Sequence, residues 1–284
     1  MPLLSPETRH DVRGTRLRQF LGHLRHPGVG PIMVMAAHPD DEVIGAGAHL
    51  GFWPGLSVVH VTDGAPRDDR YAREAGFPDR AAYAAARRRE ASAALAIAGV
   101  HSERIIGLGF TDQEASLHLR DIAERLAALV AATRPAVIVT HAYEGGHRDH
   151  DAACFAVHAA CGVIGRSGSV PPTLVEMSAY FGRDGERVTG SFLPSGEAPV
   201  IVRLDEADRS RRRHMLLCHT SQRDLLCIFP LDLECFRPAP DYDFRQPPHP
   251  GRLFYEYHDP GMDGARWRER AAAALQTLTG ARSS

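Results

Sequence analysis

Two short stretches of this chain place histidine and carboxylate side chains at spacings that suit a metal ion. Residues 38–42 read His-Pro-Asp-Asp-Glu, and residues 147–150 read His-Arg-Asp-His. Imidazole nitrogens together with a carboxylate oxygen suit zinc. Two His and one Asp would leave a position for water, as a catalytic zinc site does. The acids alone would also fit the first turn of a helix, where the helix dipole favours negative charge, but His38 is not explained in that way.

Each stretch follows a short apolar run that predicts a buried strand and precedes a pattern that predicts a helix. The predicted strands are residues 32–37 and 137–140, and the second helix covers residues 151–161. Ligands bind at the carboxyl ends of strands in an open parallel sheet. We therefore expect the two stretches to meet at one edge of a sheet, on neighbouring strands where the strand order reverses.

Strands and helices alternate through the first 160 residues. This alternation predicts right-handed βαβ units and an α/β fold: a Rossmann-like three-layer sandwich with a mostly parallel sheet and helices on both faces. Beyond residue 161 the pattern weakens, and residues 183–198 and 236–251 are predicted to be loops; the second holds five prolines and suggests a Pro-rich C-terminal extension. The remaining predicted elements are helices at 5–24, 81–99, 117–133, 205–218 and 267–278, and strands at 56–62, 104–108, 174–180 and 201–204.

Composition indicates an ordinary globular protein. Lys and Arg number 33 against 35 Asp and Glu, so the net charge of −2 gives no reason to expect nucleic acid as a partner.

Residues 1–284 are predicted to form a single domain, with a core at about 30–225 and a C-terminal loop and helix at about 226–284 packed on it. The five cysteines form no C-x-x-C pair, and we see neither a signal peptide nor a run of about 18 apolar residues. A cytoplasmic protein without a membrane span is expected.

The two motifs resemble those of the PIG-L/LmbE family of zinc-dependent N-deacetylases. Residues 37–42 (AHPDDE) match the first family motif fully, whereas the second usually has Pro where this chain has Arg148, which is not a ligand position. The resemblance covers roughly residues 30–225 and continues through residues 62–64, 87–90, 107–109 and 219–222. It implies removal of the acetyl group from an N-acetylated amino sugar or glycoconjugate, with one Zn²⁺ per chain, although other divalent ions could serve in vitro. A homo-oligomer remains open.

The residues and the resemblance together assign roles within the motifs. His38, Asp41 and His150 are predicted to hold the metal, and Asp40 to act as the general base toward the attacking water. The helix N-terminus is expected to lower the pKa of Asp40. His147, in its protonated form, would stabilise the oxyanion or protonate the departing amine, and Asp149 would orient it.

Other residues receive weaker assignments. Arg67 and Asp112 are predicted to contact substrate from loops at the ligand-binding edge, as is Tyr143, which precedes the second motif. Some family members carry a Tyr directly before the motif His, where this chain has Gly146, and Tyr143 is a candidate substitute. Arg87 is expected to pair with Glu90 at i, i+3 rather than to contact substrate.

Three further histidines near the motifs, His49, His141 and His158, are expected to be structural. Two alternative functions stay open. One is a different single-metal hydrolase, such as an esterase, another amidase or a phosphoesterase, although the sequence offers no second ligand set for a two-metal site. The other is a non-catalytic sugar-binding member of the family.

Overall fold

The computed structural model describes residues 6–196, 198–258 and 261–280 of the chain. Its main sheet has seven strands in the order β3-β2-β1-β4-β5-β9-β8. These strands are β1 (Ile32–Ala36), β2 (Ser57–Pro66), β3 (Ile105–Asp112), β4 (Val137–Thr140), β5 (Thr173–Met177), β8 (Val200–Arg203) and β9 (Leu233–Pro238). A separate hairpin pairs β6 (Tyr180–Arg183) with β7 (Glu186–Thr189). The helices are α1 (Pro6–Gly22), α2 (Asp41–Ala46), α3 (Asp69–Glu74), α4 (Arg80–Ile97), α5 (Leu119–Thr133), α6 (Arg148–Arg166), α7 (Glu206–Cys218), α8 (Arg223–Leu226) and α9 (Gly264–Gly280).

The strand order reverses between β1 and β4, as predicted. From β1 the chain continues through β2 to β3 on one side, and from β4 to β5 on the other, and all of these neighbours pair in parallel. β9 and β8 extend the sheet antiparallel beyond β5, which makes it mixed. The two His/Asp motifs, residues 38–42 and 147–150, therefore follow the carboxyl ends of adjacent strands. Ligands usually bind at this edge of such sheets.

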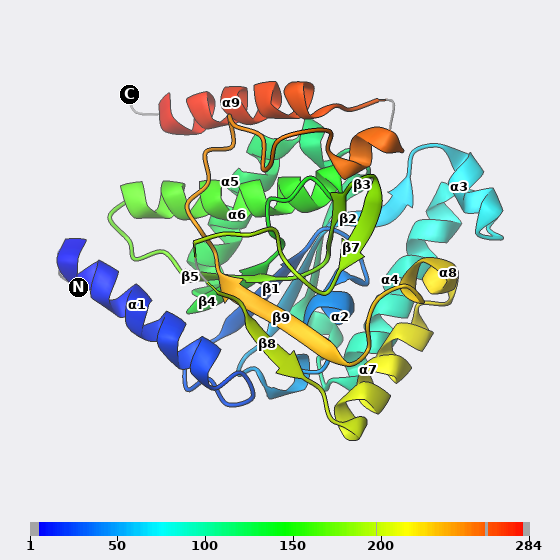
Figure 1. Ribbon diagram of the computed structural model, residues 1–284, viewed down its shortest axis with the longest axis horizontal. Coiled ribbons are helices and arrows are strands. Elements are labelled where there is room, and N and C mark those ends of the chain that lie inside the picture. The colour runs from blue at the N-terminus through cyan, green and yellow to red at the C-terminus, as the bar shows by residue number, and fades with distance from the viewer. Residues whose placement is uncertain (1–5, 197, 259–260, 281–284) are drawn as a thin grey trace.

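The sheet is buried on both faces. Along β1, Met33 and Met35 belong to one hydrophobic cluster with residues of α5, α6 and α9, whereas Ile32 and Val34 belong to another with residues of α1, α2, α4 and α7. This alternation is the period of two expected when helices cover both sides of a strand. Figure 1 shows α5, α6 and α9 on one side of the sheet and α4 and α7 on the other.

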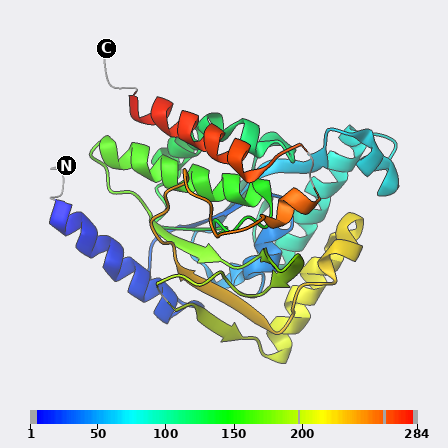
Figure 2. The ribbon, with the colours of Figure 1, turned by 45° about the horizontal axis from the view of Figure 1, so that its top comes forward.

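The C-terminal part is not the Pro-rich extension that the sequence suggested, because it supplies a strand of the main sheet. β9 lies inside the main sheet between β5 and β8, within a stretch partly predicted to be loop. Phe244 in the Pro-rich segment and Trp267 in α9 are buried in the same cluster as α5 and α6. Figure 2 shows α9 running along the outside of these two helices. The C-terminal residues thus complete one face of the core.

Two further elements differ from the prediction. Residues 180–189, where a predicted strand ends and a loop at 183–198 was predicted, form the β6–β7 hairpin. Residues 69–74 form the short helix α3, whereas a loop was expected at 63–70. Among the helices that the structure describes, none combines the length and apolar character needed to cross a bilayer.

Candidate active site

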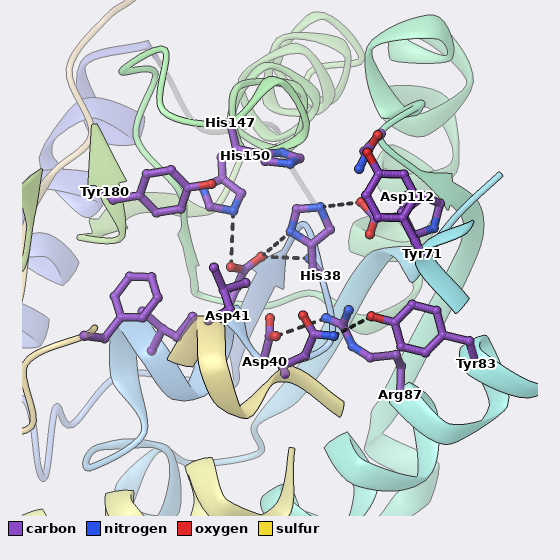
Figure 3. A pocket seen from close by; sticks show the side chains of 16 residues that line it. His38, Asp40, Asp41, Tyr71, Tyr83, Arg87, Asp112, His147, His150 and Tyr180 are labelled. Atoms are coloured by element: carbon purple, nitrogen blue, oxygen red, sulfur yellow. Dashed lines mark hydrogen bonds and ion pairs between the residues drawn. The ribbon is translucent and has the colours of Figure 1, made fainter. Parts of the chain in front are cut away.

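The side chains of the two motifs meet in one pocket at the carboxyl end of the sheet. His38 and Asp40 lie between β1 and α2, and Asp41 is the first residue of α2. His147 and His150 lie where α6 begins after β4. Figure 3 shows His38, Asp41 and His150 turned toward one another in the centre of this pocket. The sequence prediction that both strand ends contribute to one site is therefore confirmed.

Asp41 is surrounded by imidazole nitrogens. Nδ1 of His38 lies 3.2 Å from Oδ2 of Asp41, Nε2 of His141 lies 3.3 Å from the same oxygen, and Nε2 of His150 lies 3.2 Å from Oδ1. Burial opposes ionisation of Asp41, but the three histidines, His150 most strongly, outweigh it and hold its pKa well below the ordinary value. Burial in turn lowers the pKa of His150 to about 4. At neutral pH the pocket thus offers an ionised carboxylate beside a neutral imidazole, which is the state that binds a metal.

Groups of three potential ligands occur at this place. His38, His147 and His150 form one group, and Asp41, His141 and His150 form another, with ligand atoms within 4.8 Å of one another in each. The predicted ligands His38, Asp41 and His150 are drawn from these two groups. The nature of the donors, histidine nitrogens around one carboxylate, fits zinc.

His141 is a close neighbour that sequence reasoning treated as purely structural. Its ring stacks on that of His150, with centroids 4.0 Å apart, and its Nε2 accepts a hydrogen bond of 3.1 Å from the backbone N–H of Ala37. The lone pair that would bind a metal is therefore already engaged. The structural interpretation also fits His49, whose Nδ1 lies 2.5 Å from Oε2 of Glu234.

Asp40, beside Asp41, has a different environment. Its Oδ2 accepts a hydrogen bond of 3.0 Å from Nη2 of Arg87, and both side chains are buried. The backbone of Asp40 has φ 153° and ψ −25°, a strained conformation for a residue other than glycine. Its N–H donates to Oε2 of Glu42 and to the carbonyl of His38, at 3.2 and 3.0 Å. These contacts on both sides fix the direction of the carboxylate.

The pKa of Asp40 is raised, contrary to the expectation that the helix dipole would lower it. Burial is the main cause and outweighs the attraction of Arg87, so that the pKa reaches about 7. The helix that follows has only six residues, Asp41–Ala46, and desolvation of the carboxylate is the stronger effect. A buried carboxylate with a pKa near neutrality is suited to act as a general base.

Arg87 and Glu90 were expected to pair with each other, but each of them bonds to other residues. Arg87 donates to the carbonyl oxygens of Gly64 and Pro39, at 2.8 and 3.2 Å, in addition to Asp40. Gly64 has φ +68°, and a Cβ there would lie 2.9 Å from Cζ of Arg87. Gly64 and Arg87 are thus packed against each other behind Asp40.

Glu90 faces the segment 219–222 instead. Its carboxylate accepts hydrogen bonds of 2.6 Å from the hydroxyls of Thr220 and Ser221, and one of 3.0 Å from the N–H of Ser221. Gln222, in the same segment, lines the pocket. Glu90 therefore links α4 to residues 220–221, which directly precede the pocket residue Gln222.

His147 is present in the site, but not in the charged form that was expected. It is the N-cap of α6, and its Nδ1 accepts a hydrogen bond of 3.1 Å from the N–H of Asp149. Burial, followed by the neighbouring His38, lowers its pKa to about 3. A neutral ring whose Nδ1 is an acceptor carries its proton on Nε2, so His147 can donate one hydrogen bond without being cationic.

Asp149 was predicted to orient His147, but its carboxylate bonds to other groups. Oδ2 accepts a hydrogen bond of 2.6 Å from the N–H of Gln113, and Oδ1 one of 3.1 Å from the N–H of Ala115. Oδ2 also lies 3.4 Å from Nε2 of His38. Asp149 thus ties the loop after β3 to the start of α6 and supports His38.

The three predicted substrate contacts have different outcomes. Asp112 lines the pocket, with Oδ1 3.0 Å from Nε2 of His38. Arg67 lies on the surface, where it makes two hydrogen bonds of 2.6 Å to Glu114, and it does not line this pocket. Tyr143 is buried, donates to the carbonyl of Gln246 at 3.0 Å and stacks on Trp267. The substrate roles of Arg67 and Tyr143 are therefore not supported by the geometry.

Sequence reasoning missed one aromatic residue of the site. Tyr180, at the start of β6, lines the pocket, and its ring centroid lies 5.2 Å from that of His150. No motif marks it, because the hairpin that carries it comes thirty residues after His150 and was predicted to be partly loop.

Comparison with known proteins agrees with the motif resemblance. Residues 33–161 match the family described as PIG-L, GlcNAc-PI de-N-acetylase. This segment of the chain belongs to the PIG-L/LmbE family. It holds both motifs, and family members are metal-dependent N-deacetylases. No curated protein matches the sequence.

Solved structures share the fold at low sequence identity. The A40926 pseudoaglycone deacetylase Dbv21 is 20% identical with a TM-score of 0.57, over 75% of this chain and 98% of its own. The N,N'-diacetylchitobiose deacetylase from Pyrococcus horikoshii is 16% identical with a TM-score of 0.53, over 84% and 94%. GalB, a 4-carboxy-2-hydroxymuconate hydratase from Pseudomonas putida, is 16% identical with a TM-score of 0.50, over 76% and 99%. Since the fold also carries a hydratase, the reaction must be argued from the site.

Proposed function

We propose that this chain is a zinc-dependent hydrolase that removes the acetyl group from an N-acetylated amino sugar or its conjugate, giving a free amine and acetate. The observation that carries the proposal is the different environment of two adjacent carboxylates. Asp41 lies 3.2–3.3 Å from a ring nitrogen of each of three histidines, whereas Asp40 accepts a hydrogen bond from Arg87 at 3.0 Å. Neighbouring carboxylates whose environments separate their pKa values commonly have separate roles. Asp41 is suited to be a ligand and Asp40 a base.

His38, Asp41 and His150 are the residues that would hold the metal. The alternatives are weaker, because Nε2 of His141 accepts from Ala37 and Nδ1 of His147 accepts from the backbone of α6. Zinc bound there supplies a Lewis acid that polarises the acetyl carbonyl and lowers the pKa of water. His38 would serve as a ligand in its neutral form, although Asp112 and Asp41 outweigh the effect of burial and raise its pKa well above the ordinary value when no metal is bound.

The side chains of the pocket account for the proton movements of amide hydrolysis. Asp40 accepts a proton from the water that attacks the acetyl carbon, and its partner Arg87 holds the carboxylate in place. His147 donates a hydrogen bond from Nε2 toward the oxyanion, and it lies near both candidate ligand histidines, with ring centroids 4.6 Å from His38 and 5.2 Å from His150. The C–N bond then breaks, and the amine leaves with the proton that Asp40 received.

The pocket also offers groups for a sugar. Asp112, Arg87, Gln113 and Gln222 line it beside the metal-type residues, and their polar atoms suit the hydroxyls of a sugar ring. Two proteins with this fold are described as a pseudoaglycone deacetylase and an N,N'-diacetylchitobiose deacetylase, and the second name states an N-acetylated sugar as the substrate. These names support the substrate class and do not identify the substrate.

The test is release of acetate by zinc-loaded protein from a panel containing N-acetylglucosamine, its 1-phosphate, a simple alkyl glycoside of it and diacetylchitobiose. We expect acetate and free amine in equal amounts with at least one sugar. Including acetate esters and phosphate esters in the panel distinguishes an esterase or phosphoesterase. Binding of a sugar without any hydrolysis would indicate the non-catalytic alternative and would refute the proposal.

A further inference from the structure

Tyr180 reaches the site from outside both motifs and is held there on several sides. Its ring lies 5.2 Å from that of His150 and 6.1 Å from those of Phe229 and Phe254, measured between centroids. The guanidinium of Arg187 lies 4.9 Å from the centre of the same ring. Figure 3 shows the ring entering the pocket beside His150, with its hydroxyl on the side of the motif histidines. The ring is therefore placed by packing and has little freedom to turn away.

The backbone of Tyr180 explains the glycine that precedes the second motif. A Cβ on Gly146 would lie 2.1 Å from the carbonyl oxygen of Tyr180, a distance that no side chain can accommodate. The hairpin also packs closely on Phe254, since a Cβ on Gly182 would lie 2.7 Å from Cβ of Phe254. Position 146 is thus restricted to glycine because the hairpin occupies the space, and the same contact fixes Tyr180 relative to His147.

The hydroxyl of Tyr180 has no hydrogen-bond partner among the described residues. By contrast, the hydroxyl of Tyr143 bonds to the carbonyl of Gln246, and that of Tyr242 bonds to Glu176 at 2.7 Å. Burial raises the pKa of Tyr180 above its ordinary value, so its hydroxyl keeps its proton. A hydroxyl that faces a pocket and has no partner in the protein is suited to bond a ligand there.

We propose that the Tyr180 hydroxyl donates a hydrogen bond to the acetyl oxygen of the substrate, as a second donor beside His147. The inference rests on the proposed function and adds a residue to it. When water attacks the acetyl carbon, the electron pair of the C=O bond moves to the oxygen, and this oxygen accepts the hydrogen bond more strongly as its charge grows. Tyr180 transfers no proton, and the electron pair returns when the amine leaves. The ring centroids of His147 and Tyr180 each lie 5.2 Å from that of His150, and both residues line the pocket in which the acetyl group would bind.

Tyr180→Phe tests this role, because it removes the hydroxyl and keeps the ring that packs on Phe229, Phe254 and Arg187. Tyr143→Phe is the matched control, since it removes a buried tyrosine hydroxyl that bonds to a backbone carbonyl outside the pocket. With zinc-loaded proteins, Tyr180→Phe should lower kcat by about 10²-fold, the lower end of the loss for one oxyanion donor, with KM little changed. The kcat of Tyr143→Phe should stay at the wild-type value. Wild-type kcat in Tyr180→Phe would overturn the inference.

A binding measurement separates this inference from the proposed function. If the wild-type protein hydrolyses no N-acetylated compound, the proposed function fails, and the role of Tyr180 is then judged with acetohydroxamate, a zinc-chelating acetyl compound. Calorimetry on the zinc-loaded proteins should show binding weakened by about 5–10-fold in Tyr180→Phe, the effect of one lost hydrogen bond, and unchanged in Tyr143→Phe. Equal affinity in Tyr180→Phe and wild type would show that the hydroxyl does not face the bound acetyl oxygen.

Discussion

Replacing Asp40 with Asn should separate catalysis from metal binding. The substitution exchanges one carboxylate oxygen for an amide group, so an oxygen remains to accept the 3.0 Å hydrogen bond from Arg87. Asn also tolerates a positive φ better than most residues, which matters at a position with φ 153°. The variant should therefore fold as the wild type does, while no base remains to accept a proton from water.

The expected loss follows from the role of a general base. Such a group contributes about 10²–10⁴-fold to the rate, or about 3–5 kcal/mol of the activation free energy at about 1.4 kcal/mol per factor of ten. Acetate release by zinc-loaded Asp40→Asn should fall by that amount, with zinc content unchanged by elemental analysis. Asp63→Asn is a matched control, because Asp63 also bonds an arginine, Arg80 at 2.6 Å, but does not line the pocket.

Two results would refute this reasoning. Asp40→Asn with wild-type kcat would show that another group accepts the proton. Loss of zinc from Asp40→Asn with zinc retained in Asp41→Asn would show that the two carboxylates have exchanged roles.

The other predictions concern the remaining pocket residues and one buried acid. His150→Ala should lose both zinc and activity, which elemental analysis and acetate release would show together. His147→Ala should keep zinc and lower kcat by about 10²–10³-fold in steady-state assays. Asp112→Ala should lower kcat/KM by an equivalent of about 1–3 kcal/mol, whereas Arg67→Ala should leave it unchanged. Burial raises the pKa of Glu144 to about 8, so the folded state keeps a proton that the unfolded chain releases near its ordinary pKa of 4.5. The free energy of unfolding should therefore fall from about pH 5 to pH 8, by up to about 1.4 kcal/mol per pH unit for this group. Denaturant titrations should show a smaller fall in Glu144→Gln.

The position of the site was predictable because it depends on local patterns and on a general rule of sheet topology. Residues 32–37 and 137–140 are apolar runs that end in His and Asp, and parallel strands place their carboxyl ends at one edge. The alternation of elements up to residue 161 predicted a parallel sheet in which the two strands that precede the motifs are neighbours, as β1 and β4 are. The family resemblance added roles to His38, Asp41 and His150, and the structure brings these three side chains together.

The electrostatics were not predictable from sequence. Desolvation depends on how completely a group is buried, and a short stretch such as residues 38–42 does not reveal this. Asp40 was therefore expected to have a lowered pKa and His147 to be cationic, whereas burial raises the first pKa and lowers the second.

Contacts between distant segments account for the other differences. Tyr143 was assigned to the pocket because it precedes the second motif, but Trp267 of α9 and Gln246 hold it in the core. Tyr180 was not assigned at all, since only the folded hairpin brings it to His150. β9 was missed because its partners β5 and β8 are far away in sequence and the strand ends at Pro238.

The most direct test of the account is titration of metal-free protein with zinc while acetate release from an N-acetylated amino sugar is measured. We expect no activity without metal and a linear rise in activity that ends at one zinc per chain, because His38, Asp41 and His150 form one site. Full activity in metal-free protein, or a rise that requires two zinc ions per chain, would contradict it.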